Sequence, residues 1–129
     1  MADGAGRRRI LVVEDEDNIA IALDYLITRE GYAHERMSSG AGALGRIRET
    51  HPDLVLLDVM LPEVSGYEIC QGVRLDPALC DVKILMMTAL GSSIERKKGL
   101  ALGADGFIAK PFEVQALRAE VRRLLGEGV

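Results

Sequence analysis

The sequence predicts an α/β fold in which a five-stranded parallel sheet carries helices on both of its faces. Runs of large apolar residues without alternation at positions 10–13, 54–57 and 84–87 are typical of strands buried on both sides. Segments with helical spacing of apolar residues alternate with the predicted strands five times, through short connections. A chain of 129 residues is long enough to form one domain with a sizeable core.

The composition and net charge argue against several classes of protein. Hydrophobic residues make up 48% and charged residues 28% of the chain, as in soluble globular proteins. Lys and Arg number 16 against 20 Asp and Glu, and this net charge of -4 argues against a dedicated nucleic-acid binder. Two cysteines are too few for a disulfide scaffold, which favours a reducing compartment. No apolar stretch approaches the roughly 18 residues of a membrane span, so we expect a cytoplasmic protein.

The first strand and helix follow a small, Gly-rich start, and we expect residues 1–8 to form a flexible N-terminus. Positions 10–13 form the first strand, and the acids at 14–17 place negative charge where a helix begins. The apolar positions with helical spacing are Ile19, Leu23, Leu26 and Ile27. Gly31 is predicted to end this helix as a C-cap.

A more polar second strand is expected over residues 32–37, near an edge of the sheet. Ser38 and Ser39 are candidate caps of a second helix, which His51 and Pro52 would close. The positions predicted to face inward are Ala41, Leu44 and Ile47.

The third strand, at 54–57, is the most apolar and ends in Asp58. Pro52 before it and Pro62 after it leave little room for a helix. In open parallel sheets, ligands bind at the carboxyl ends of the strands, which makes Asp58 a candidate binding residue. The simpler alternative is an aspartate that marks the end of a strand and faces solvent.

The third helix has capping-box spacing at Ser65 and Glu68, and it is predicted to end near Pro77. A fourth buried strand follows at 83–88 and finishes in a hydroxyl.

The remaining elements are predicted in the same way. Ser92 and Glu95 form a second capping box for a fourth helix, which Gly103 ends. The last strand covers 106–109, and the final helix stops at Gly126. One face of that helix is apolar, at Val114, Leu117, Val121 and Leu124.

Polar residues gather where the strands end. The first, third, fourth and fifth strands are followed or finished by Asp15, Asp58, Thr88 and Lys110, and Glu14 precedes Asp15. Because parallel strands end at one edge, these side chains share a crevice. Two acids about 4 Å apart repel by about 4 kcal/mol at an effective dielectric near 20, so a positive charge is expected nearby. Hard oxygen ligands in an open site suit Mg²⁺.

This set of residues suits phosphoryl transfer. A carboxylate can act as a nucleophile and form an aspartyl phosphate. The Thr88 hydroxyl can donate to a phosphoryl oxygen, and Lys110 supplies positive charge. Structural alternatives remain: Glu14 as an acid at a helix N-terminus, Thr88 as a turn residue, and Lys110 as a surface lysine.

The chain resembles the receiver domain of response regulators in two-component signalling, from about residue 9 to residue 125, which leaves 126–129 as a C-terminal tail. The motifs that carry the resemblance are Glu14-Asp15, Asp58 with Pro62 and Gly66, Thr88-Ala89, and Lys110-Pro111-Phe112. Each motif is weak alone, but together in this order they are highly specific. The resemblance implies a doubly wound, flavodoxin-like three-layer sandwich with strand order 2-1-3-4-5. It also implies a cis bond before Pro111.

The resemblance further implies the roles of the site residues. Asp58 would be the phosphoacceptor, and Mg²⁺ would be held by Asp15, Asp58 and the backbone carbonyl of Met60. Glu14 would bind the metal through water, and Lys110 would pair first with the acceptor carboxylate and then with the phosphoryl group. Many receivers have Asp where this chain has Glu14, so the metal affinity can differ.

Two further positions would transmit the signal: Thr88 as the switch hydroxyl and Phe107 as the switch aromatic, which rotates inward. A mechanism that needs a phenol hydroxyl at Phe107 is excluded. Met60 and Leu90 flank the phosphoryl site, and as apolar residues they cannot position a water. This favours a longer-lived phosphorylated state.

The function implied by the resemblance is that of a signalling switch and not of an enzyme. A sensor histidine kinase or a histidine phosphotransfer protein would supply the phosphoryl group. The surface of the fourth helix, the last strand and the fifth helix would then act on a downstream partner or an attached output domain. No direct contact with nucleic acid or with a membrane is expected, and the resemblance allows a dimer that forms on phosphorylation.

Three other functions fit the sequence less well. A Mg²⁺ phosphohydrolase with an aspartyl nucleophile would commonly need a second acid where this chain has Met60. A carrier of FMN would need a hydroxyl- or Gly-rich phosphate loop, whereas the acids at 14–17 would repel a phosphate. A DNA-binding regulator would need a further domain after Leu125, and the chain is compatible with being a piece of such a longer protein.

Overall fold

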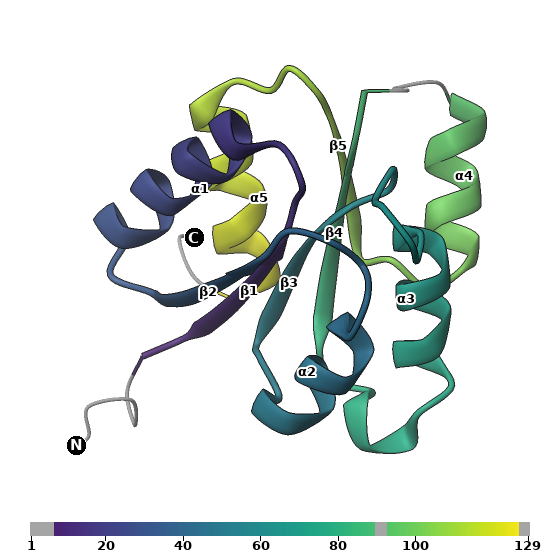
Figure 1. Cartoon of the computed structure of the whole chain (residues 1–129). Helices are drawn as coiled ribbons and strands as arrows, with labels where there is room; N and C mark the ends of the chain where they lie inside the picture. Colours follow the sequence, from purple (N-terminus) through teal and green to yellow (C-terminus); the bar gives the residue numbers. More distant parts are fainter. Residues whose placement is uncertain (1–6, 90–92, 127–129) are drawn as a thin grey trace.

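The computed structural model describes residues 7–89 and 93–126 and shows a twisted parallel sheet between two layers of helices (Figure 1). The strands are β1 (Arg9–Val13), β2 (Ala33–Met37), β3 (Leu54–Asp58), β4 (Lys83–Thr88) and β5 (Gly106–Ala109). The helices are α1 (Asp17–Arg29), α2 (Ala43–Thr50), α3 (Gly66–Arg74), α4 (Ser93–Ala101) and α5 (Val114–Leu124), with a 3₁₀ turn at Pro77–Leu79. The strand order β2-β1-β3-β4-β5, with every pair parallel, confirms the predicted doubly wound fold.

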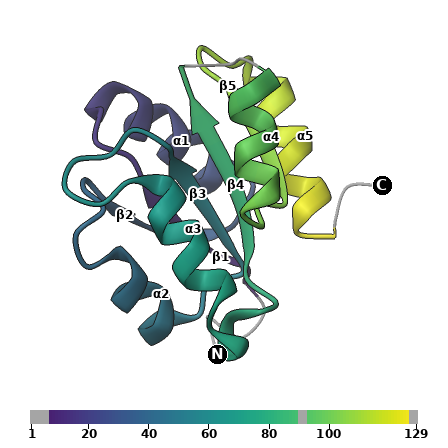
Figure 2. The same ribbon diagram turned by 90° about the vertical axis from the view of Figure 1, so that its right-hand side faces the viewer.

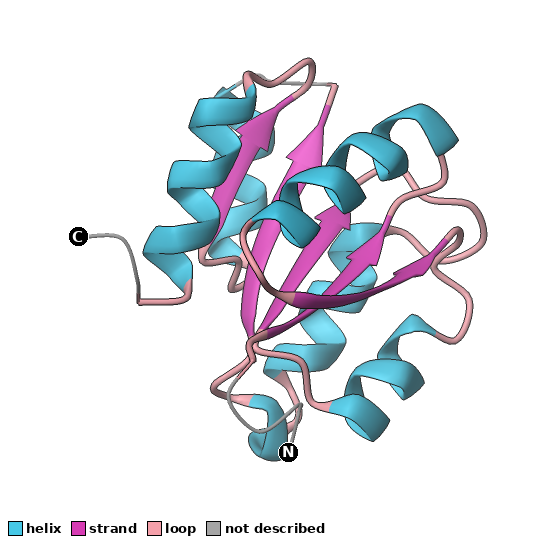
Figure 3. Ribbon diagram, turned by 90° about the vertical axis from the view of Figure 1, so that its left-hand side faces the viewer, coloured by secondary structure: helices cyan, strands magenta, loops and turns pink. Residues whose placement is uncertain are grey.

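Helices cover both faces of the sheet. α1 and α5 lie on one face, seen in front in Figure 3, and α2, α3 and α4 lie on the other, seen in front in Figure 2. Successive β3 residues alternate between the two cores: Leu54 and Leu56 pack with α1 and α5, whereas Val55 and Leu57 pack with α2 and α3. This two-sided burial explains why the run at 54–57 is apolar without alternation. By contrast, β2 is an edge strand, as predicted, and none of its residues is fully buried.

Several helix boundaries follow the predicted signals. The Ser65 hydroxyl accepts a bond from the Glu68 amide at 3.2 Å, and the Glu68 carboxylate accepts one from the Ser65 amide, also at 3.2 Å. This is the predicted capping box. Gly31 and Gly103 follow α1 and α4 with φ of +84° and +106°, a left-handed conformation that favours glycine at the end of a helix.

The start of α2 differs from the prediction. Ser38 and Ser39 do not cap this helix, which begins at Ala43 after Gly42, whose φ is +77°. Ala41 is exposed and precedes the helix, while Ala43 and Ile47 are its buried residues. The physical reason is a tertiary contact: a Cβ on Gly40 would stand 2.0 Å from the carbonyl oxygen of Val64. The chain therefore turns closely against the β3–α3 loop before the helix can start.

The apolar face of α5 is also shorter than predicted. Leu117, Val121 and Leu124 are buried, but Val114 is 59% exposed. Val114 lies in the first turn of the helix, at a surface groove between α1 and α5 that Tyr25 and Arg118 also line. The predicted cap at Ser92, the flanking residue Leu90, the first six residues of the N-terminus and the tail at 127–129 lie outside the described residues.

α4 has the weakest apolar contact with the sheet among the described helices. Ile94 is 74% exposed, and Gly99 is the buried residue of this helix. A Cβ added to Gly99 would stand 3.1 Å from the Met86 sulfur and 3.2 Å from the Phe107 ring, so the absence of a side chain lets α4 approach the sheet. Elements with few buried apolar contacts open most easily.

Candidate functional site

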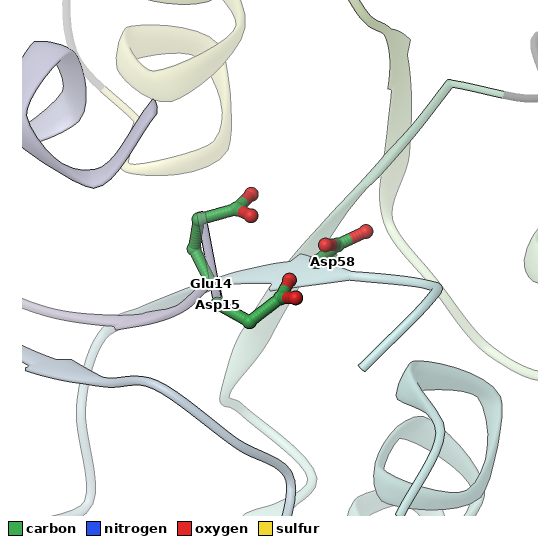
Figure 4. A group of neighbouring side chains, drawn as sticks. All are labelled: Glu14, Asp15 and Asp58. Atoms are coloured by element: carbon green, nitrogen blue, oxygen red, sulfur yellow. The ribbon is translucent and has the colours of Figure 1, made fainter. Parts of the chain in front are cut away.

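The predicted site residues come together at the carboxyl edge of the sheet. Asp15 lies in the loop after β1, Asp58 ends β3, Thr88 ends β4, and Lys110 directly follows β5. Figure 4 shows Glu14 and Asp15 directly after β1 and Asp58 at the end of β3, and each offers a carboxylate oxygen within 4.8 Å of the others. Parallel pairing of β1 with β3 brings Glu14 and Asp15 close to Asp58, which is more than 40 positions away, and pairing of β3 with β4 places the ends of those two strands side by side.

Lys110 lies among the acids as a shared counter-charge. Its ammonium nitrogen is 2.7 Å from Glu14 Oε1, 3.3 Å from Asp58 Oδ2 and 3.6 Å from Glu16 Oε1. Burial alone would lower the pKa of Lys110, but its contacts with Glu14 and Asp58 outweigh that effect and raise its pKa above the ordinary value. Lys110 is therefore held in its charged form beside the Asp58 carboxylate.

Asp58 is nearly buried, with 3% of its surface exposed. Burial and then repulsion from Glu14 raise its pKa to about 6, although Lys110 opposes this shift. The Met60 amide donates to Asp58 Oδ1 at 3.1 Å, which orients the carboxylate and partly offsets its charge. A bound cation would stabilise the ionised form of this carboxylate and would therefore counteract the rise in its pKa.

Glu14 and Asp15 differ sharply in their surroundings. Glu14 is fully buried, and its Oε2 accepts a hydrogen bond from the Glu16 amide at 3.0 Å while Oε1 faces Lys110. Asp15 is exposed and lines an open cleft with Asp58, Met60 and Lys110. Asp15 and Asp58 are thus the carboxylates best placed to meet an ion in this cleft, and their hard oxygens fit a divalent cation such as Mg²⁺.

Thr88 and Phe107 lie deeper in the fold. Thr88 is fully buried, and Phe107 is only 5% exposed. The Phe107 ring packs between the sheet and α4, with the Arg96 guanidinium 5.7 Å from its centroid. The ring therefore occupies a buried position in this structure, and its rotation on phosphorylation stays a prediction.

Two residues near the site were not singled out from the sequence. Glu16 reaches Lys110 with its carboxylate and Glu14 with its amide. Arg36, on β2, donates to the carbonyl oxygen of Glu14. Glu16 stands in the acidic run at 14–17, which was a usable signal, whereas nothing near Arg36 in the sequence indicates a contact 22 positions away.

Two further observations concern the backbone and the surface. The bond between Lys110 and Pro111 is cis, as the resemblance implied. Within the described ranges, no helix has both the length and the apolar character needed to cross a membrane.

Comparisons with known proteins agree with this geometry. The family model described as "Response regulator receiver domain" matches residues 10–122. The phosphate regulon transcriptional regulatory protein PhoB of Rhizobium meliloti is 42% identical over 117 residues, which cover 91% of this chain and 52% of that protein. The chain therefore spans about half the length of the curated relatives that it matches.

Solved structures show the same fold. A putative response regulator from Chloroflexus aurantiacus is 36% identical, with a TM-score of 0.88 and coverage of 94% of this chain and 99% of that one. The receiver domain of the sensor histidine kinase PA1611 from Pseudomonas aeruginosa is 25% identical, with a TM-score of 0.85 and coverage of 95% and 100%; that structure has a magnesium ion coordinated in its active site cleft. Taken with the fold and the acidic cluster, these matches show that the chain belongs to the response regulator receiver domain family.

Proposed function

We propose that this domain is a phosphoacceptor switch in which Asp58 receives a phosphoryl group in the presence of Mg²⁺. The observation that carries this proposal is the position of Asp58, a buried carboxylate 3.3 Å from Lys110 at the floor of an open cleft that the exposed Asp15 also lines. The alternative, an aspartate that only marks the end of a strand and faces solvent, does not explain this burial or the contact with Lys110. The donor would be a phosphohistidine on a kinase or phosphotransfer protein.

The residues of the cleft would divide the work of phosphoryl transfer. Asp15, Asp58 and the backbone carbonyl of Met60 would hold Mg²⁺, which supplies positive charge to the phosphoryl oxygens. An oxygen of Asp58 attacks phosphorus, and the bond from phosphorus to the donor breaks with its electron pair leaving on the donor. Lys110 then exchanges part of its contact with Asp58 for a phosphoryl oxygen, and Glu14 keeps it nearby through the 2.7 Å contact.

A labelling experiment tests this assignment. Incubation with acetyl phosphate and Mg²⁺ should add one phosphoryl group to the wild-type protein, detected by intact-mass spectrometry. Asp58→Asn should lose this label, because an amide cannot act as the nucleophile. Asp81→Asn removes an exposed acid outside the cleft and should label like the wild type. Equal labelling of wild type and Asp58→Asn would refute the assignment.

The signal would leave through the surface of α4, β5 and α5. We expect α4 to be displaced most easily, because its buried residue is Gly99, which has no side chain to pack on the sheet. Its contacts with α3 are polar. Those contacts are a hydrogen bond from the Tyr67 hydroxyl to Glu95 and the placement of Lys98 over the Tyr67 ring, 4.4 Å from its centroid. A phosphoryl group on Asp58 would draw the Thr88 hydroxyl toward it and shift the population of α4 positions.

Amide hydrogen exchange measures this transmission. Beryllofluoride, a mimic of the phosphoryl group, should change the protection of residues 93–112 in the wild-type protein. Thr88→Ala should still accept a phosphoryl group at Asp58 but should show much smaller changes in residues 93–112. Thr28→Ala, a threonine substitution on α1, is the matched control and should respond like the wild type. Changes confined to the cleft loops in the wild type would contradict the proposed path.

Partners follow from the family and from the length of the relatives. A sensor histidine kinase or a histidine phosphotransfer protein would deliver the phosphoryl group, and a downstream protein or an attached output domain would receive the signal. The match to transcriptional regulators of about twice this length suggests an output domain that binds DNA, with no direct nucleic-acid contact by the receiver itself. The α4-β5-α5 surface is also where a phosphorylation-dependent dimer would form.

A further inference from the structure

Arg36 uses all three of its guanidinium nitrogens on the segment that carries Asp15. Its Nε and Nη2 donate to the carbonyl oxygen of Glu14 at 3.0 and 2.8 Å. Its Nη1 lies 2.9 Å from Asp17 Oδ1, at the first residue of α1. One side chain on the edge strand β2 therefore binds the β1–α1 connection on both sides of Asp15, at Glu14 and at Asp17.

The carbonyl of Glu14 lies beyond the last residue of β1, at Val13, where the regular pairing of the strand has ended. The amide of the same residue donates to the carbonyl of Met37 at 3.0 Å. The backbone of Glu14 is thus hydrogen-bonded to β2 twice: its amide donates to the Met37 carbonyl, and its carbonyl accepts from the Arg36 side chain. The carbonyl of Glu14 belongs to the peptide group that joins it to Asp15, so Arg36 restricts the direction in which Asp15 leaves the strand.

The chemistry of arginine suits this task. Hydrogen bonds from a charged donor are about twice as strong as neutral ones, and the planar fork can reach a carbonyl and a carboxylate at once. Arg36 makes these contacts to a backbone carbonyl and to Asp17, which are not proposed to bind the metal. Arg36 can therefore act on a bound cation in two ways only, through the repulsion of its charge and through the position of the loop.

We propose that Arg36 is a positioning residue that holds Asp15 in the geometry required for divalent cation binding. This inference rests on the proposed function, because it assumes that Asp15 and Asp58 bind Mg²⁺. Supporting residues of this kind typically change metal affinity about 10- to 100-fold when they are replaced. The effect on the cation has a sign that separates positioning from simple electrostatics. Removal of a positive charge near a cation site should strengthen cation binding, whereas loss of positioning should weaken it.

The test is a Mg²⁺ titration of the full chain by isothermal calorimetry. Arg36→Met should weaken Mg²⁺ binding about 10-fold, against the electrostatic expectation. Arg36→Lys retains the charge but cannot bridge Glu14 and Asp17 with a fork, so it should recover only part of the affinity. Arg46→Met is the matched control: Arg46 reaches β2 through Glu35 at 2.8 Å, and its replacement removes the same charge without touching the β1–α1 connection.

A second readout reports on the loop itself. Amide exchange at residues 15–17 should become faster in Arg36→Met and remain unchanged in Arg46→Met, while urea unfolding shows whether each variant is folded. Mg²⁺ affinity equal to or higher than that of the wild type in Arg36→Met would overturn the inference. Failure of the wild-type protein itself to bind Mg²⁺ would instead overturn the proposed metal site, and the inference with it. The two failures are therefore distinguishable.

Discussion

Replacement of Asp58 by asparagine should raise the free energy of unfolding of the metal-free protein at pH 7 by about 3 kcal/mol. The folded protein holds this carboxyl at a pKa of about 6, against an ordinary value of 3.8, because the group is buried and then because Glu14 repels it. Ionisation of Asp58 at neutral pH therefore costs stability, which asparagine avoids. The amide oxygen of asparagine can still accept the hydrogen bond that the Met60 amide donates to Asp58.

The gain should depend on pH in a defined direction. Below about pH 4, Asp58 is protonated in both the folded and the unfolded chain, so wild type and variant should differ little. Between pH 4 and pH 6 the folded protein retains a proton that the unfolded chain releases, and wild-type stability falls as the pH rises. Above pH 6 the full cost remains. The difference between the two proteins should therefore grow from pH 4 to pH 6 and then level off.

Urea unfolding in the presence of a chelator, at pH 4 and pH 7, measures this difference. Asp15→Asn is the matched control within the same cluster, and it should gain much less because the Asp15 carboxylate is exposed to water. Added Mg²⁺ should stabilise the wild type more than Asp58→Asn, since a ligand stabilises the state that binds it. A gain at pH 4 as large as that at pH 7 would show that the effect does not come from the ionisation of Asp58.

Gly66→Ala should lower the free energy of unfolding by about 3 kcal/mol, at the upper end of the usual cost of overpacking. A Cβ at this position would stand 2.3 Å from the carbonyl oxygen of Asp58 and 2.9 Å from Cα of Val59. Both are backbone atoms, so the clash cannot be relieved by rotation of a side chain. The loop after β3 would have to move, and the Asp58 carboxylate would move with it.

Gly45→Ala is the opposite case and serves as its control. Gly45 lies inside α2, is exposed, and has no heavy atom within 4 Å of an added Cβ. Alanine there should raise stability by about 0.5 to 1 kcal/mol, because it has less conformational freedom in the unfolded chain and a better helix propensity. Urea midpoints of the two variants give the comparison. A Gly66→Ala protein as stable as the wild type would mean that the close approach of α3 to β3 is not required.

The site residues that could be predicted share one property: each stands at the end of a strand that the local pattern of apolar residues predicts. Asp15, Asp58, Thr88 and Lys110 follow from apolar runs and from the rule that parallel strands end at one edge. Arg36 could not be found in this way. Its role depends on the pairing of β2 with β1, which places it opposite Val12 and within reach of Glu14.

The expectations for the start of α2 and for the apolar face of α5 failed because tertiary contacts override local preference. Ser38 and Ser39 are good capping residues, but the close packing of Gly40 against Val64 moves the start of α2 to Ala43. Val114 fits the apolar period of α5, but it stands at the first turn, where the helix does not yet cover the sheet. The Phe107 ring is buried because Gly99 leaves room for it beneath α4, and a helix contact of that kind has no local signature.

The sequence by itself determined the order and type of the elements, the central position of β3, and which side chains would gather at the carboxyl edge. These follow from hydrophobic periodicity and from parallel topology, which depend on residue spacing along the chain. Only the tertiary structure decided how deeply each acid is buried and which acids Lys110 contacts, namely Glu14, Asp58 and Glu16. It also decided the hydrogen bonds of Arg36 to the β1–α1 connection. Burial and counter-charge depend on neighbours from other strands, and those neighbours set the pKa of Asp58.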